Sequence, residues 1–203
     1  MAERYGITLI VGERERGKTT FGVREVVTKL DRGVYDVAYA NIHIKHRKAR
    51  FIKYEQLHTL RAPTLDGQPR GVLYMDQLHK YLEARQSMSP RNKYVNDVMI
   101  ESRQHGLDVI GTTWRKGSVD LNFRTFGQRY VSAKRLGDRF RYFFAEPETG
   151  RLYQKDLLFA DCRARWWSYF DTAELVEDVD PRWDPRLAPV PPSMEKMRRS
   201  RSR

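Results

Sequence analysis

A glycine-containing segment near the start of the chain has the spacing of a phosphate-binding loop. Residues 12–19 read GERERGKT and fit the pattern G-x(4)-G-K-[ST]. Glycines at this spacing let backbone N–H groups surround a phosphate at the positive end of the following helix. The expected ligand is ATP with Mg²⁺, with Lys18 on the β- and γ-phosphates and the Thr19 hydroxyl on the metal. The residues expected to bind the nucleotide are Gly12, Glu13, Arg14, Glu15, Arg16, Gly17, Lys18, Thr19 and Thr20.

A carboxylate at the end of a buried strand is expected to complete the magnesium shell. The apolar run 72–75 ends at Asp76, which we assign to this role beside Thr19. The next residue is Gln77, whereas many NTPases have Glu there. An amide orients an attacking water but cannot accept its proton, so the sequence leaves open which group activates the water. The other acids of this region, interpreted as exposed helix residues, are Glu83, Asp97 and Glu101.

Hydrophobic spacing predicts alternating strands and helices. The predicted strands are 7–11, 37–44, 72–75, 107–113 and 130–134, and the predicted helices are 21–30, 77–85 and 93–104. Gly33 and Gly106 are expected to end two of the helices. Residues 139–144 and 152–159 flank EPETG and predict a hairpin. This order indicates an α/β fold with a central, mostly parallel sheet flanked by helices, plus a C-terminal β-hairpin.

Length and composition limit the remaining possibilities. The chain has 203 residues with 38 Lys+Arg and 26 Asp+Glu, a formal net charge of +12. We expect one domain at residues 1–180 and a flexible tail, Pro-rich and then Arg/Ser-rich, at 181–203. No apolar run approaches the roughly 20 residues of a membrane span, and the start lacks a signal region. The lone Cys162 excludes an internal disulfide and indicates a reducing compartment.

Two mid-chain segments carry much of the positive charge. Residues 43–61 have a net charge of +5 and residues 115–141 a net charge of +6. Such segments would bind nucleic acid phosphates with little sequence preference and a steep dependence on salt. The alternative, that they are solvated surfaces, stays open. The tail would likewise tether DNA or another partner, or only keep the chain soluble.

Taken together, these motifs resemble the FtsK–HerA superfamily of additional-strand, RecA-like P-loop NTPases. In Glu101–Arg124 the chain is similar to the superfamily's helix, following strand and arginine; the matching residues are Arg103, Gly106, Thr113, Arg115, Val119 and Asp120. Trp114 stands where the superfamily commonly has Gln. The segment 39–44 also resembles the second strand of the zonula-occludens-toxin-like branch.

The resemblance implies a ring-forming motor, with a hexamer expected, that hydrolyses ATP to move double-stranded DNA. The compact size points to genome-packaging ATPases of tailless, membrane-containing icosahedral viruses, acting in the host cytoplasm with capsid or portal vertex proteins as further partners. Thr113, with Thr112 as the second choice, would sense the γ-phosphate. Arg124, favoured over Arg103 and Arg129, would complete a neighbour's site. The alternatives are a phage assembly ATPase of the zonula-occludens-toxin-like type and a non-motor nucleotide-binding protein.

Overall fold

The computed structural model describes residues 6–82, 90–119 and 121–171. The expected domain boundary at residue 180 and the tail 181–203 lie outside these ranges, as do Glu83 and Asp120. Within them, no helix has the length and apolar character needed to cross a membrane.

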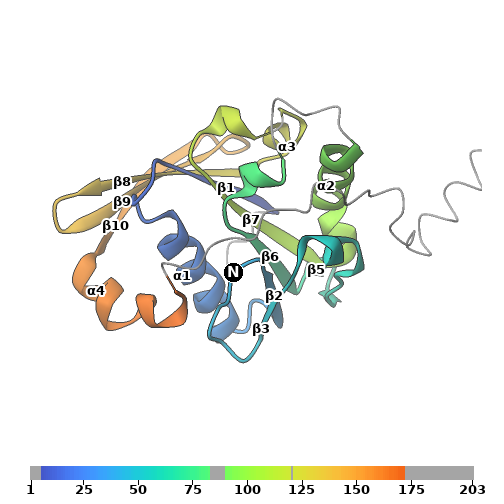
Figure 1. Cartoon of the computed structure of the whole chain (residues 1–203), viewed down its shortest axis with the longest axis horizontal. Coiled ribbons are helices and arrows are strands. Elements are labelled where there is room, and N and C mark those ends of the chain that lie inside the picture. The colour runs from blue at the N-terminus through green and yellow to red at the C-terminus, as the bar shows by residue number, and fades with distance from the viewer. Residues whose placement is uncertain (1–5, 83–89, 120, 172–203) are drawn as a thin grey trace, which may run out of the picture.

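An eight-stranded sheet lies at the centre of the described residues (Figure 1). The strand order across it is β10-β9-β8-β1-β7-β6-β2-β3. The strands are β1 (Ile7–Val11), β2 (Val37–Ala40), β3 (Ala49–Phe51), β6 (Gly71–Met75), β7 (Leu107–Thr113), β8 (Arg129–Leu136), β9 (Arg139–Glu146) and β10 (Arg151–Leu158), with a separate small hairpin of β4 (Thr64–Leu65) and β5 (Gln68–Pro69). From β8 to β3 the sheet is parallel, and β9 and β10 extend it by antiparallel pairing. The predicted α/β architecture is confirmed, with β7 inserted between β1 and β6.

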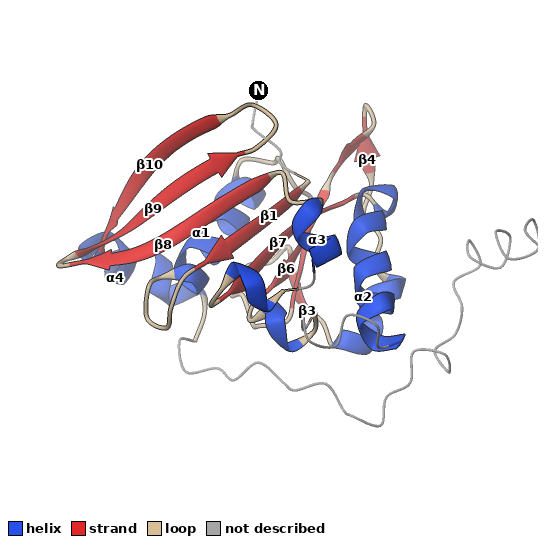
Figure 2. Ribbon diagram, turned by 90° about the horizontal axis from the view of Figure 1, so that it is seen from above, coloured by secondary structure: helices blue, strands red, loops and turns tan. Residues whose placement is uncertain are grey.

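Helices cover both faces of the sheet (Figure 2). The described helices are α1 (Lys18–Asp31), α2 (Pro90–Ile100), α3 (Leu121–Thr125) and α4 (Phe159–Ala164). The connection from β1 through α1 to β2 crosses the sheet in one direction, and that from β6 through α2 to β7 crosses it in the other. Because such crossovers are right-handed, the two helices lie on opposite faces. The carboxyl ends of β1, β6 and β7 therefore meet at one edge, where open α/β sheets bind their ligands.

Differences from the predicted elements have local causes. The strand predicted at 37–44 ends at Ala40, because Asn41 turns inward to bond the backbone of Asp76. The short edge strand β3 was not predicted, since three residues within a basic run show no hydrophobic periodicity. The helix predicted at 93–104 becomes α2 followed by a 3₁₀ turn, Glu101–His105, which ends at Gly106 as expected. Of the helix predicted at 77–85, the structure describes residues 77–82. In this part the only helical element is the 3₁₀ turn Leu78–Lys80.

The strands β8, β9 and β10 form a meander that packs against α1. Phe21, fully buried on α1, lies 4.6 Å from Tyr142 and 5.5 Å from Phe144 between ring centroids. The predicted hairpin is therefore part of the main sheet rather than an appendage. Its core-facing side supports the helix that follows the phosphate-binding loop.

A buried ion pair joins the same two elements. Arg129 at the start of β8 lies 3.2 Å from Glu25 of α1, and the two side chains are only 4% and 19% exposed. Burial raises the pKa of Glu25, but Arg129, Lys29 and Arg24 together lower it below its ordinary value. Arg129 is therefore committed inside its own chain, which removes it from the candidates for an arginine that reaches a neighbour.

We expect Arg129→Ala to lower the free energy of unfolding by about 3–5 kcal/mol, because it leaves the Glu25 carboxylate buried without its partner. Urea unfolding at neutral pH measures this loss. Since the pKa of Glu25 is depressed in the folded state, its contribution is present above the unfolded pKa and disappears as pH falls through the folded one. Arg141→Ala, which breaks a surface pair with Asp156, is the matched control and should cost much less, because solvent screens that pair. Equal losses in the two variants would contradict this account.

Candidate active site

The glycine loop between β1 and α1 folds back over the start of the helix. Glu15 and Gly17 have left-handed backbone angles, with φ of 58° and 79°. Gly17 is required for a second reason, because a Cβ there would lie 2.5 Å from Cγ of Phe140. The Tyr142 hydroxyl donates to the Gly17 carbonyl at 3.0 Å. The meander thus fixes the loop at Gly17, the residue directly before α1.

Lys18 is the first residue of α1, and it lines the cavity described below. Its Nζ donates to the Glu13 carbonyl at 2.8 Å. Burial lowers the pKa of this ammonium group, Asp76 acts against the shift, and Arg14 adds to it. A phosphate beside Lys18 would replace lost hydration with a charge-assisted bond, so the site favours an anion. On the outer side of the loop, Glu13 pairs with Arg16 at 3.1 Å in solvent.

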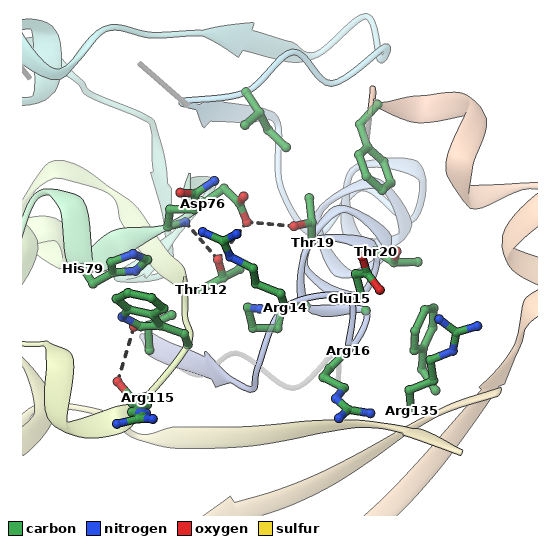
Figure 3. Close-up of a pocket in the computed structure, with 18 of the residues that line it drawn as sticks. Arg14, Glu15, Arg16, Thr19, Thr20, Asp76, His79, Thr112, Arg115 and Arg135 are labelled. Carbon is green, nitrogen blue, oxygen red and sulfur yellow. Dashed lines mark hydrogen bonds between the residues drawn. The ribbon is translucent and has the colours of Figure 1, made fainter. Parts of the chain in front are cut away.

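Asp76 connects the three elements of the site (Figure 3). Its Oδ1 accepts bonds from the hydroxyls of Thr19 on α1 at 3.0 Å, Tyr74 on β6 at 3.0 Å, and Thr112 on β7 at 2.7 Å. All three donate to the same oxygen, so these bonds do not use Oδ2. The structure therefore brings together Thr19 and Asp76, which the sequence assigned to the metal.

Two residues that the sequence analysis did not select hold this carboxylate in place. Burial and the nearby Asp76 raise the pKa of Tyr74 well above its ordinary value, so its hydroxyl stays protonated and donates. Its ring fits because α1 has Gly22 at the contact, where a Cβ would lie 2.3 Å from Cε2 of Tyr74. Asn41 donates to the Asp76 carbonyl at 2.9 Å and accepts from its N–H at 2.7 Å. The alternation of side chains along β6 could have indicated Tyr74, which is two residues before Asp76 and shares its face.

The same alternation separates the two threonines at the end of β7. Thr112 points to the α1 face and bonds Asp76, and it also accepts from the backbone N–H of Gln77 at 3.0 Å. Thr113 points to the opposite face, where its hydroxyl lies 2.9 Å from that of Ser118. Both threonines line the cavity described below. Thr112 bonds Asp76 and Thr113 does not, because successive strand residues face opposite sides of the sheet. The assignment of γ-phosphate sensing to Thr113, with Thr112 as the second choice, stays a prediction.

The oxygen atoms of Thr19 and Asp76 fit a magnesium ion. Hydroxyl and carboxylate oxygens are the hard ligands that Mg²⁺ prefers, and in such sites waters and substrate phosphates supply the rest. No group of three or more His, Cys, Asp or Glu side chains that could hold a metal occurs in the described part of the chain. This sparse set of protein ligands fits an ion held mainly by the nucleotide.

A cavity of about 1700 Å³ surrounds the loop and is strongly basic. The described residues that line it include the basic side chains Arg14, Arg16, Lys18, Lys80, Arg115, Arg135 and Arg163 and the acidic side chains Glu15, Asp76 and Asp171. One side of the cavity, around Arg135, is aromatic: Phe159 lies 4.7 Å from Phe140, and the Trp167 indole donates to Thr20 at 3.2 Å. Figure 3 shows Arg135 and His79 on opposite sides of the loop. The arrangement suits a ligand with a polyphosphate at one end and a flat ring at the other.

The remaining predicted residues lie around or outside this cavity. Gln77 lines it in a left-handed conformation, with φ of 52°. Trp114 is 47% exposed and stacks on His79. Arg124 on α3 does not line the cavity, and its carbonyl accepts a bond from the Tyr130 hydroxyl. Arg103 is exposed in the 3₁₀ turn before Gly106.

Comparison with solved structures agrees with this geometry. The N-terminal domain of zonular occludens toxin from Neisseria meningitidis superposes with a TM-score of 0.59 and 16% identity, over 83% of this chain and 100% of that domain. The genome packaging NTPase of Sulfolobus turreted icosahedral virus 2, bound to sulfate, gives 0.56 and 11%, over 77% and 98% of the two chains. The chain therefore shares its fold with these two proteins. No family model and no curated protein sequence matches this P-loop chain.

We expect Tyr74→Phe to lower the free energy of unfolding by about 1.5–3 kcal/mol, since it removes a hydrogen bond to a buried carboxylate while keeping the ring on Gly22. Chemical denaturation without nucleotide measures the change. The matched control is Tyr39→Phe, whose hydroxyl donates to the Arg61 carbonyl at the surface and should cost about 1 kcal/mol or less. A Tyr74 variant as stable as this control would refute the role given to the phenol.

Proposed function

We propose that this chain is a magnesium-dependent ATPase that moves double-stranded DNA during viral genome packaging. The observation that carries the proposal is the position of Lys18, Thr19 and Asp76 at the carboxyl edge of a sheet in which β7 separates β1 from β6. Lys18 would hold the β- and γ-phosphates, and Thr19 and Asp76 would hold Mg²⁺, which when bound neutralises charge that develops on the transferring phosphoryl group. Trp167 and Phe159 would border the adenine.

The comparisons support this assignment through a shared fold. One of the similar proteins is described as a genome packaging NTPase, and it has been solved with AMPPCP, giving a TM-score of 0.53 at 11% identity. In packaging, the partners would be duplex DNA, further copies of the chain in a ring, and proteins of the capsid or portal vertex, all in the host cytoplasm. The basic cavity fits the nucleotide, and basic residues elsewhere would contact the DNA.

A second candidate is an assembly ATPase of the zonula-occludens-toxin type. The observation in its favour is that the fold matches the whole of the toxin's N-terminal domain, with a TM-score of 0.59. The two proposals differ in what should stimulate turnover. Duplex DNA should accelerate hydrolysis by a packaging motor, whereas hydrolysis indifferent to duplex DNA supports the second candidate.

For Lys18→Ala we expect ATP turnover to fall by about a hundredfold or more, because the variant lacks the cation that stabilises the phosphoryl transition state. Phosphate release by the full chain, with and without duplex DNA at low salt, measures this. Lys29→Ala, on the same helix but outside the cavity, should keep wild-type turnover. If DNA leaves wild-type turnover unchanged while a small acceptor becomes phosphorylated, the motor is refuted in favour of a kinase. DNA movement that survives Lys18→Ala would instead indicate a nucleic-acid-binding protein with a degenerate loop.

The two basic segments lie at opposite sides of the sheet, β3 at one edge and the β8–β9 region toward the other (Figure 1). In the second segment much of the charge is paired, since Arg139 and Arg141 contact Asp156 and Arg129 contacts Glu25. The first segment differs. Its exposed Lys45, Arg47 and Arg50 form no ion pair with another described residue. The β3 edge is therefore the better candidate for contact with DNA phosphates.

The double variant Arg47→Ala/Arg50→Ala should weaken duplex DNA binding and reduce the slope of log K against log salt by about 2, one for each lost phosphate contact. Binding titrations at several salt concentrations measure the slope. Arg139→Ala/Arg141→Ala removes the same charge from paired positions and should change the slope less. The reverse order would assign the DNA contact to the β8–β9 region.

Arg124 stays a proposal for the arginine that completes a neighbour's site. Arg124 does not line the cavity of its own chain, which agrees with action in a neighbouring subunit, where a cation would stabilise transition-state charge. Hydrolysis by assembled rings of Arg124→Ala subunits tests the role, which normal turnover would exclude.

A further inference from the structure

The site as described has no obvious group to take the proton from the attacking water. Gln77 follows Asp76, and an amide has no basic lone pair at neutral pH. The backbone N–H of Gln77 is fixed on Thr112 at 3.0 Å. Hydrolysis therefore needs a proton acceptor other than the residue after Asp76.

The 3₁₀ turn after Gln77 places an imidazole in the cavity. His79 is half-buried and lines the cavity together with Asp76 and Thr112 (Figure 3). The turn is held against β7 because Gly111 makes room for Leu78, where a Cβ would lie 2.6 Å from Cδ2 of that leucine. The His79 ring stacks on Trp114 with centroids 4.8 Å apart and 25° between the planes. Both the backbone and the ring of His79 are thus fixed by packing.

We propose that His79 is the general base of ATP hydrolysis, an inference that rests on the proposed function. As the water oxygen bonds to the γ-phosphorus, one water proton passes to an imidazole nitrogen. The bond from the γ-phosphorus to the β,γ-bridging oxygen breaks, and ADP leaves with its electron pair. The imidazolium then returns the proton to solvent or to the inorganic phosphate.

The other acids near the site are placed less well for this step. Among the described residues that line the cavity, the acidic side chains are Glu15, Asp76 and Asp171. Asp76 is engaged by three hydroxyls, Glu15 is exposed on the outer loop, and Asp171 follows Phe170 on the aromatic side. Asp97 and Glu101 do not line the cavity. An imidazole also has the ordinary pKa nearest neutrality, which suits a base at physiological pH.

The stacked Trp114 ring would stabilise the protonated form of His79. A cation over an indole ring is stabilised by the ring quadrupole, so the stack favours the imidazolium that forms during the reaction. Among the charged side chains that line the same cavity, Asp76 would also favour the imidazolium, whereas Arg14, Lys18, Lys80 and Arg115 would oppose it.

The test compares His79→Gln with wild type for turnover against pH, at saturating ATP and duplex DNA. Wild-type turnover should fall with a slope of one as pH drops through the titration of the imidazole. His79→Gln should lose about a hundredfold or more in turnover, lack this acid limb, and bind AMPPCP as the wild type does. His79→Ala should regain turnover when free imidazole is added. The matched control is His105→Gln, which replaces a half-buried histidine at the opposite end of β7. This variant should keep both the wild-type turnover and its decrease at acid pH.

The outcomes separate the two proposals. A His79→Gln variant with wild-type turnover and an unchanged acid limb overturns the role of His79 while leaving the ATPase intact. Loss of AMPPCP binding in this variant also overturns it, because the residue would then act in binding. If the wild type neither binds nor hydrolyses ATP, the proposed function fails and His79 loses its role with it.

Discussion

One carboxylate oxygen holds the site together. Oδ1 of Asp76 accepts hydroxyl bonds from α1, β6 and β7, and Asn41 fixes the backbone of the same residue from the end of β2. A buried carboxylate is tolerated only when its hydrogen bonds are satisfied, so these four elements must keep their register for the charge to remain there. The position of Thr19, and with it the first turn of α1, follows from this requirement.

The phosphate loop also depends on the part of the sheet farthest from it in sequence. Phe140 and Tyr142 of β9 contact Gly17, and the buried pair of Arg129 and Glu25 ties β8 to α1. A change in the meander would therefore reach the loop directly through packed groups.

The basic residues that give the chain its net charge of +12 lie in different environments. Arg129 is neutralised inside the fold, Arg14 and Lys18 face the cavity where phosphates would bind, and Arg141 pairs with Asp156 at the surface. Lys45, Arg47 and Arg50 near the β3 edge form no ion pair with another described residue and, under the proposed function, would contact DNA phosphates. Bulk charge indicated a polyanionic partner, but burial and pairing decide which arginines are available to it.

The sequence by itself determined the parts of the site that are local in the chain. The spacing of Gly12, Gly17 and Lys18 predicts the loop, and an apolar run before Asp76 predicts a strand ending in an acid, because backbone freedom and hydrophobic periodicity are properties of neighbouring residues. Only the tertiary structure decided that Thr112 rather than Thr113 meets Asp76, and that Tyr74, Asn41 and His79 join the site. These contacts depend on strand order, on which face of β7 each side chain takes, and on close approaches at Gly22 and Gly111. The alternation along β6 could have indicated Tyr74, whereas the contacts of Thr112, Asn41 and His79 join residues distant in the chain and no local pattern encodes them.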